Sequence, residues 1–184
     1  MRPQIHSFLF LVFVLQFCSL GLSDLIQDSC KKASDNDPNI SNDFCVSTLE
    51  ANPKSQTATT LGELALSAMD ITISNGTSIS STISFLLKNS TLDPFVQSCL
   101  QDCSKLYSDA SDSLFDAEAA ITNKDFGTAK SDTSAAMDAP STCEDGFKEK
   151  KGVVSPLTKE SNLFFQFTAI SLAFLNMVAR QSSS

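Results

Sequence analysis

Histidine, tryptophan and glycine are scarce in this sequence. One histidine, His6, and no tryptophan occur among 184 residues, and six glycines are scattered singly. Serine and cysteine nucleophiles are commonly activated by an imidazole, many zinc sites use one, and phosphate loops need clustered glycines. A pair of carboxylates would still suffice for a glycosidase, but the many acidic residues read more simply as a solvated surface. We therefore predict no catalytic residues, no metal and no cofactor.

Basic residues are also few. The sequence has 13 lysines and arginines against 21 aspartates and glutamates, a net charge of −8. This acidic balance argues against binding to nucleic acid or to an anionic membrane. Without His6 the chain also lacks the side chain that titrates most readily between pH 5 and 8, so we expect its own charge to change little there.

The N-terminus has the order of a secretory signal peptide. Arg2 precedes an apolar run over residues 8–17, and the small residues Gly21 and Ser23 follow. The run is shorter than the roughly 20 residues that a membrane span needs. We predict that residues 1–23 are a signal peptide cleaved after Ser23, which leaves a secreted chain of net charge −9, with 12 basic and 21 acidic residues.

Strand-like alternation is nearly absent, and apolar residues recur instead at spacings of three and four, the pattern of amphipathic helices. We predict long helices over 57–88, 94–121, 126–151 and 159–179, with a kink or break at Asn75-Gly76 and a bend at Pro140. Two short helical pieces should precede them within residues 24–51. Short connections between long helices favour an all-α, up-and-down four-helix bundle with an N-terminal helical hairpin.

Five cysteines remain once Cys18 leaves with the signal, and a secreted chain favours disulfides between them. Cys30 and Cys45 sit on the two short helical pieces, so a bridge between them would staple the hairpin; closing its loop of about 15 residues stabilises by roughly 3 kcal/mol. Cys103 and Cys143 share the inward register of two bundle helices and can pair. We therefore predict a Cys103–Cys143 bridge with Cys99, one turn before Cys103, as the free thiol; the alternative is that Cys99 pairs with Cys143.

Three asparagines stand in Asn-X-Ser/Thr sequons, which are acceptor sites for N-linked glycans in secreted proteins. They are Asn39, Asn75 and Asn89. Asn89 follows a predicted helix end and is expected to be the most accessible of the three.

The cysteine framework and its neighbours resemble the plant invertase and pectin methylesterase inhibitor family. The matching segments are Asp24 to Cys30, Phe44-Cys45, Leu100 to Cys103 with Tyr107, and Thr142 to Phe147. The stretch 147–160 is similar to a pollen-allergen branch of that family, whose members are named as invertase inhibitors.

The resemblance implies a domain over residues 24–184 and a non-catalytic function. A rigid bundle would occlude the active site of pectin methylesterase or acid invertase in a one-to-one complex. The expected location is the apoplast or cell wall, with the vacuole as a second possibility. A secreted structural or ligand-carrier protein with the same bundle is the alternative.

Invertase inhibitors of the family carry a Pro-Lys-Phe element in the loop after the Tyr-containing helix. The corresponding region here reads Asn123-Lys124-Asp125-Phe126, which keeps the lysine and the phenylalanine but has neither the proline nor the spacing. The resemblance makes Lys124, Asp125 and Phe126 candidates for target contact. The alternative for this segment is an ordinary helix–helix turn with Phe126 packed inward.

Overall fold

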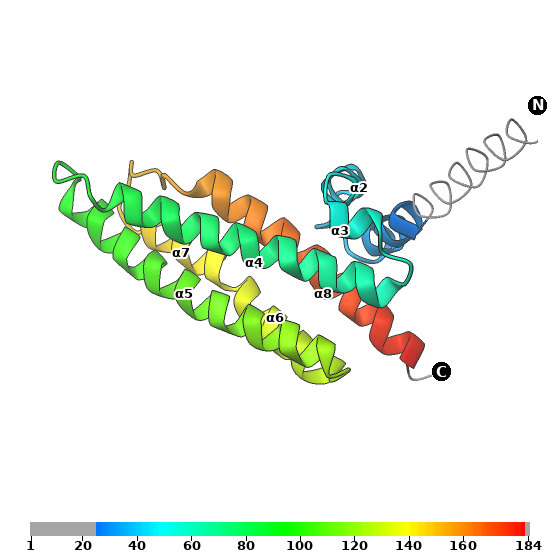
Figure 1. Ribbon diagram of the computed structural model, residues 1–184. Helices are drawn as coiled ribbons and strands as arrows, with labels where there is room; N and C mark the ends of the chain where they lie inside the picture. Colours follow the sequence, from blue (N-terminus) through cyan, green and yellow to red (C-terminus); the bar gives the residue numbers. More distant parts are fainter. Residues whose placement is uncertain (1–24, 183–184) are drawn as a thin grey trace, which may run out of the picture.

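The computed structural model describes residues 25–182, so the predicted signal peptide lies outside the described residues (Figure 1). Residues 25–36 are helical, and no strand occurs among the described residues. The elements that follow are α2 (Asn42–Glu50), α3 (Pro53–Gln56), α4 (Leu61–Leu86), α5 (Pro94–Thr122), α6 (Phe126–Met137), α7 (Ala139–Lys148) and α8 (Thr158–Ser182). The predicted all-α class is confirmed.

The four layers of the bundle are α4, α5, the pair α6–α7, and α8, and successive layers run in opposite directions (Figure 1). Helix α4 packs against α5 and α8, while α6 and α7 each pack against α5 and α8. The hairpin of residues 25–36 and α2 shares a hydrophobic cluster with α4 and α8. This is the predicted up-and-down four-helix bundle with an N-terminal hairpin.

Two sequence predictions about helix continuity had different outcomes. The bend at Pro140 is confirmed, because α6 ends at Met137 and Pro140 lies in the first turn of α7, where its missing N–H is not needed. The break at Asn75-Gly76 is wrong, because α4 is continuous across both residues. A Cβ atom on Gly76 would lie 3.1 Å from Cε2 of Phe164, so this glycine permits close packing of α8 rather than a turn.

Side chains at the N-termini of the helices set where they begin. Asp93 caps α5 by accepting from the Phe95 and Val96 N–H groups, and Pro94 follows it as predicted. Helix α3 was not predicted, although the pair Asn52-Pro53 that starts it is a recognisable cap signal. Its four residues are too few to show a periodicity.

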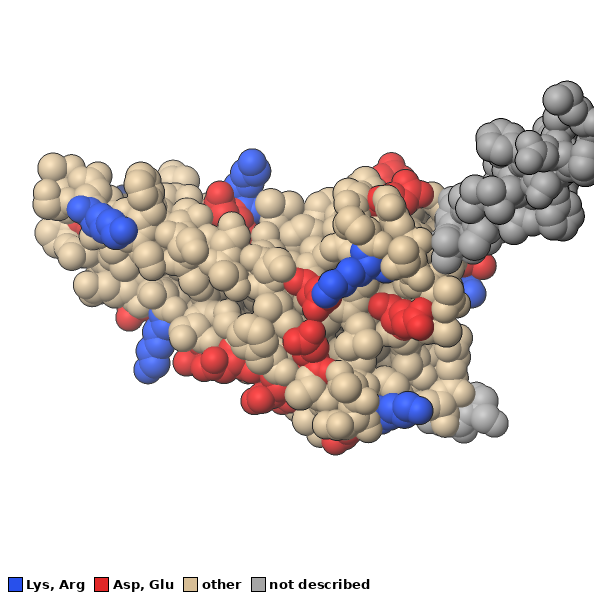
Figure 2. Space-filling view, in the orientation of Figure 1, with Lys and Arg blue, Asp and Glu red and all other residues tan. Residues whose placement is uncertain are grey.

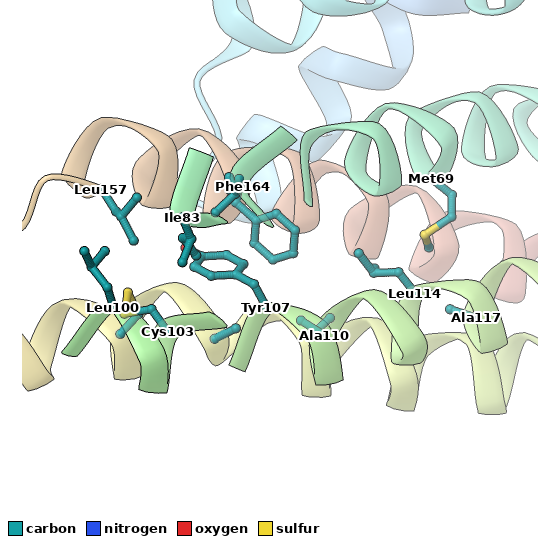
Figure 3. Close-up of a cluster of buried hydrophobic side chains, with 14 of the residues drawn as sticks. Met69, Ile83, Leu100, Cys103, Tyr107, Ala110, Leu114, Ala117, Leu157 and Phe164 are labelled. Carbon is teal, nitrogen blue, oxygen red and sulfur yellow. A yellow bond between two sulfur atoms is a disulfide. The ribbon is translucent and has the colours of Figure 1, made fainter. Parts of the chain in front are cut away.

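Large side chains fill the middle of the bundle. The rings of Tyr107 on α5 and Phe164 on α8 are both fully buried and meet edge to face, with centroids 5.3 Å apart (Figure 3). Leu100, Leu114 and Met69 extend the same cluster along the bundle axis. Close packing of this kind makes the bundle a stiff body.

Helix α8 is long and apolar enough to cross a membrane by length and composition alone. In the bundle its apolar stripe, including Phe164, Ile170 and Phe174, is buried against α4, α6 and the hairpin. It is therefore a core helix of the bundle, as predicted from the polar residues that interrupt its apolar sequence.

Candidate target-binding surface

Two disulfides fix the framework that carries the surface. Cys30 is bonded to Cys45 within the hairpin, and Cys103 on α5 is bonded to Cys143 on α7. Cys99 is the free thiol among residues 25–182; it is buried, and its Sγ lies 3.6 Å from the carbonyl oxygen of Gly146. Burial raises the pKa of this thiol, and the charges of Asp102 and Glu149 add to the effect, so thiolate formation is disfavoured.

A network of hydroxyl groups around Glu144 joins α5, α7 and α8. The Glu144 carboxylate accepts hydrogen bonds from Ser155, Thr158 and Ser161 at 2.8, 2.8 and 3.0 Å. Ser161, in turn, accepts from the Tyr107 hydroxyl at 3.0 Å. Burial raises the pKa of Tyr107 to about 12, so this hydroxyl stays protonated and remains a donor. The network holds the α7–α8 connection against the bundle.

The turn between α5 and α6 is a compact helix C-terminal motif. The Lys124 N–H donates to the carbonyl of Ile121, and the Asp125 N–H donates to the carbonyl of Ala120, both at 2.9 Å. Lys124 has φ of 60°, the left-handed conformation that usually belongs to glycine at this position. The two hydrogen bonds therefore fix the backbone of Lys124, whose exposed side chain extends from the end of the bundle.

Asp125 and Phe126 hold the turn from its other side. Asp125 caps α6: its carboxylate accepts from the Thr128 N–H and hydroxyl, and these hydrogen bonds lower the pKa of Asp125. Phe126 is partly buried and packs against both hydrophobic clusters. Of the three candidate contact residues, Lys124 and Asp125 are exposed, whereas Phe126 is an anchor of the turn.

The outward face of α5 leads to this turn and is acidic. Asp102, Asp109, Asp112 and Asp116 recur at steps of seven, three and four and are all exposed, so they share one face of the helix. The exposed Lys105 falls in the same register between Asp102 and Asp109, so this face is net negative but not purely acidic. Acidic side chains gather along the edge that α5 forms in Figure 2. Phe115 lies beside this row and leaves 53% of its surface exposed, which is unusual for an aromatic residue of this size. We call the four aspartates and Phe115 the α5 face.

A charged cluster lies where α3, α4 and α5 meet, in a cleft of about 590 Å³. Lys54 of α3 forms an ion pair with Asp70 of α4, and Glu118 of α5 stands beside Asp70. Burial raises the pKa of Glu118, as do a hydrogen bond to Asp70 and the negative charge of Asp70, while Lys54 opposes the shift. The carboxyl group of Glu118 therefore keeps its proton to a higher pH than an ordinary glutamate does.

The described residues include no group of three or more histidine, cysteine or carboxylate side chains placed to hold a metal ion. The three sequon asparagines occupy different environments. Asn89 is exposed in the α4–α5 connection, Asn39 is exposed beside α2, and Asn75 is half-buried within α4.

One known family matches most of the chain, over a range that includes the hairpin and the four disulfide-bonded cysteines. The family model described as "Plant invertase/pectin methylesterase inhibitor" matches residues 24–174. The chain belongs to this inhibitor family. The family comprises inhibitors of enzymes rather than enzymes, as the names of its members state.

Relatives in the family carry names for both kinds of target. A protein of Platanus acerifolia with the name "Putative invertase inhibitor" is 46% identical over 156 residues, which are 85% of this chain and 86% of the relative. "Pectinesterase inhibitor 12" of Arabidopsis thaliana is 39% identical over 154 residues, 84% of this chain and 87% of the relative. The two names leave the choice of target enzyme open.

Solved structures of the family share the fold. A pectin methylesterase inhibitor from Arabidopsis thaliana superposes with a TM-score of 0.60 at 22% identity, covering 84% of this chain and 95% of that one. A mutant form of a pectin methylesterase inhibitor from Arabidopsis gives a TM-score of 0.65 at 24% identity, covering 74% and 89%. At this identity the likeness establishes the helical fold alone.

Sequence reasoning did not find the Glu144 network or the pairing of Glu118 with Asp70. The partners in each case lie on different elements, and no local spacing connects them. Sequence reasoning did not find the α5 face either, although this face has a signal in the sequence. Its aspartates fall opposite the apolar positions of α5, so the periodicity that predicts the helix also predicts their exposure.

Proposed function

We propose that the chain is a secreted inhibitor that occludes the active site of pectin methylesterase or acid invertase in a one-to-one complex. Membership of the inhibitor family over residues 24–174 carries this proposal. The predicted signal peptide and the disulfides support secretion, with the apoplast or cell wall as the expected location and the vacuole as a second one.

A rigid body suits inhibition by occlusion. Two disulfides, a close-packed core and the Glu144 network fix the bundle before it meets a target. Little conformational entropy is then lost on binding, so more of the contact energy appears as affinity. We propose that the α5 face and Lys124 form the contact surface, because both are exposed on the same helix or at its end.

Charge indicates the chemistry of the partner. The α5 face presents four aspartates, so a matching enzyme surface would carry lysine or arginine side chains at the rim of its cleft. Phe115 would fill an apolar recess next to that rim. Complementary charge of this kind chiefly raises the association rate, and added salt should slow association.

The decisive experiment titrates the purified chain against pectin methylesterases and acid invertases. Inhibition that reaches completion at one equivalent and competes with substrate supports occlusion. Reversal of two charges in Asp112→Lys/Asp116→Lys should slow association by roughly tenfold or more, since steering contributes 10- to 1,000-fold. The control is Asp28→Lys/Asp43→Lys, which changes net charge equally at exposed positions of the hairpin region.

Three results would contradict the proposal. Absence of inhibition across both enzyme classes would favour the carrier alternative. Equal slowing by the control pair would show that net charge matters and the α5 face does not. Inhibition that substrate cannot compete away would argue against occlusion. A carrier with an internal tunnel is disfavoured by the structure, because the side chains of Tyr107 and Phe164 fill the middle of the bundle.

A further inference from the structure

We propose that Asn89 is the principal N-glycosylation site of the secreted chain and that Asn75 carries no glycan. The inference rests on the secretion that the proposed function includes, but not on inhibition. All three sequons satisfy the same sequence pattern, so the distinction comes from what the asparagine and the hydroxyl residue of each sequon do in the structure.

At Asn89 the sequon hydroxyl is bonded to its own asparagine. The Thr91 hydroxyl donates to Oδ1 of Asn89 at 2.8 Å, and the Thr91 N–H donates to the same oxygen at 3.0 Å. Both bonds use Oδ1 rather than the Nδ2 that accepts the sugar, and both side chains are exposed. The contact spans two residues, so this turn can form before the bundle folds.

At Asn75 the sequon lies inside a helix, and its asparagine oxygen is buried without a hydrogen-bond partner. Asn75 lies in the interior of α4 with its Oδ1 buried, next to the closely packed Gly76. The hydroxyl of its sequon, from Thr77, donates to the carbonyl of Ile73 at 3.1 Å. A glycan on Asn75 would have to emerge from the packed side of the helix, so a modified chain could not form this bundle.

Asn39 is intermediate between these two. Its Nδ2 donates to Oδ1 of Asp37 at 2.9 Å, and its backbone carbonyl accepts from Gln166 of α8 at 2.7 Å. The hydroxyl of its sequon, from Ser41, instead caps α2 by accepting from the Phe44 N–H. Asn39 is exposed but tied into the junction between the hairpin and α8, so its occupancy should be lower than that of Asn89.

The modification is a group transfer from a lipid-linked oligosaccharide pyrophosphate. Nδ2 of Asn89 attacks the anomeric carbon of the first sugar, and an N–C bond forms. The C–O bond to the pyrophosphate breaks, the lipid pyrophosphate leaves, and Nδ2 gives up one of its two protons. No oxidant or reductant is needed.

The position of this glycan is compatible with target binding. Asn89 lies in the α4–α5 connection, at the opposite end of α5 from the α5–α6 turn (Figure 1). Helix α5 has 29 residues, so about 43 Å separates its two ends at 1.5 Å per residue. Lys124 and the nearer part of the α5 face should therefore stay accessible on the glycosylated protein.

The test expresses the full chain in plant cells and analyses the secreted protein. The protein is digested with a protease, and an N-glycosidase in ¹⁸O water then removes the glycans and converts each glycosylated asparagine to ¹⁸O-labelled aspartate, which mass spectrometry detects. We expect Asn89 to be occupied in most molecules, Asn39 in fewer, and Asn75 in none. Asn89→Gln and Thr91→Val should both remove the principal glycan, whereas Thr91→Ser, which keeps the hydroxyl, should retain it.

Several outcomes would overturn the inference: a glycan on Asn75, an empty Asn89 in the secreted chain, higher occupancy at Asn39 than at Asn89, or retention of the chain in the cytosol without glycan. Asn39→Gln is the matched control and should leave the Asn89 glycan in place. Occupancy is read by mass, so this result stands whether or not the chain inhibits either enzyme.

Discussion

Lys124 combines two features that substitution can separate: a left-handed backbone and an exposed charge. At a φ of 60° a residue with a Cβ atom loses about 1–2 kcal/mol relative to glycine. Glycine also loosens the unfolded chain, which costs about 0.4–1 kcal/mol. Lys124→Gly should therefore raise the free energy of unfolding by about 0.5–1 kcal/mol, or the melting temperature by roughly 1–4 °C for a chain of this size.

The assay is thermal or denaturant unfolding with the disulfides intact. Lys124→Ala keeps the left-handed strain and loses the charge, so its stability should stay within about 0.5 kcal/mol of the parent. Asn123→Gly is the matched control: Asn123 precedes Lys124 with φ of −82°, where glycine relieves nothing and should destabilise slightly. If Lys124 contacts a target enzyme, both Lys124 variants should weaken the complex to the same extent.

Two results would refute this reasoning. A loss of stability in Lys124→Gly equal to that in Asn123→Gly would show that the left-handed conformation stores no cost. Weaker binding by Lys124→Gly alone would show that the shape of the turn matters and that the charge of Lys124 does not.

Three other predictions test groups that the fold buries wholly or in part. The pKa of Glu118 is raised in the folded state, so protonated Glu118 favours folding and this contribution is lost as pH rises through its folded pKa. In denaturant titrations, Glu118→Gln should therefore become more stable relative to the parent as pH rises from 4 to 7. Glu63→Gln should not, because the pKa of Glu63 is lowered. Tyr107→Phe removes the hydrogen bond to Ser161 and should cost about 1 kcal/mol in calorimetry. Cys99 should react with iodoacetamide only after unfolding, and non-reducing peptide maps should show it unpaired; rapid labelling of the native chain would contradict its burial.

Predictions in which several local signals agree succeeded. Helix α5 was expected over 94–121 and spans Pro94–Thr122, since a cap, a first-turn proline and an unbroken apolar stripe all agree. The same holds for the hairpin, where Cys30 and Cys45 are 15 residues apart on neighbouring helical pieces.

Predictions that depended on two helices were less secure. The predicted Cys103–Cys143 disulfide is present, but Cys99 was a rival partner in the sequence because cysteines one turn apart share a helix face. The axial position of α7 against α5 decides for Cys103. Gly76 was predicted to break the helix, because the ring of Phe164 that requires a glycine here is 88 positions away in the sequence.

The sequence by itself thus determined the helical class, the start of α5 and the exposure of the α5 face. These follow from capping, periodicity and charge within about one helix. The tertiary structure decided the Cys103–Cys143 pairing, the continuity of α4 at Gly76, the inward packing of Phe126 and the contact between Glu118 and Asp70. Each of these depends on how one helix is placed against another, and that placement is set by the packing of side chains from distant segments, which no local pattern records.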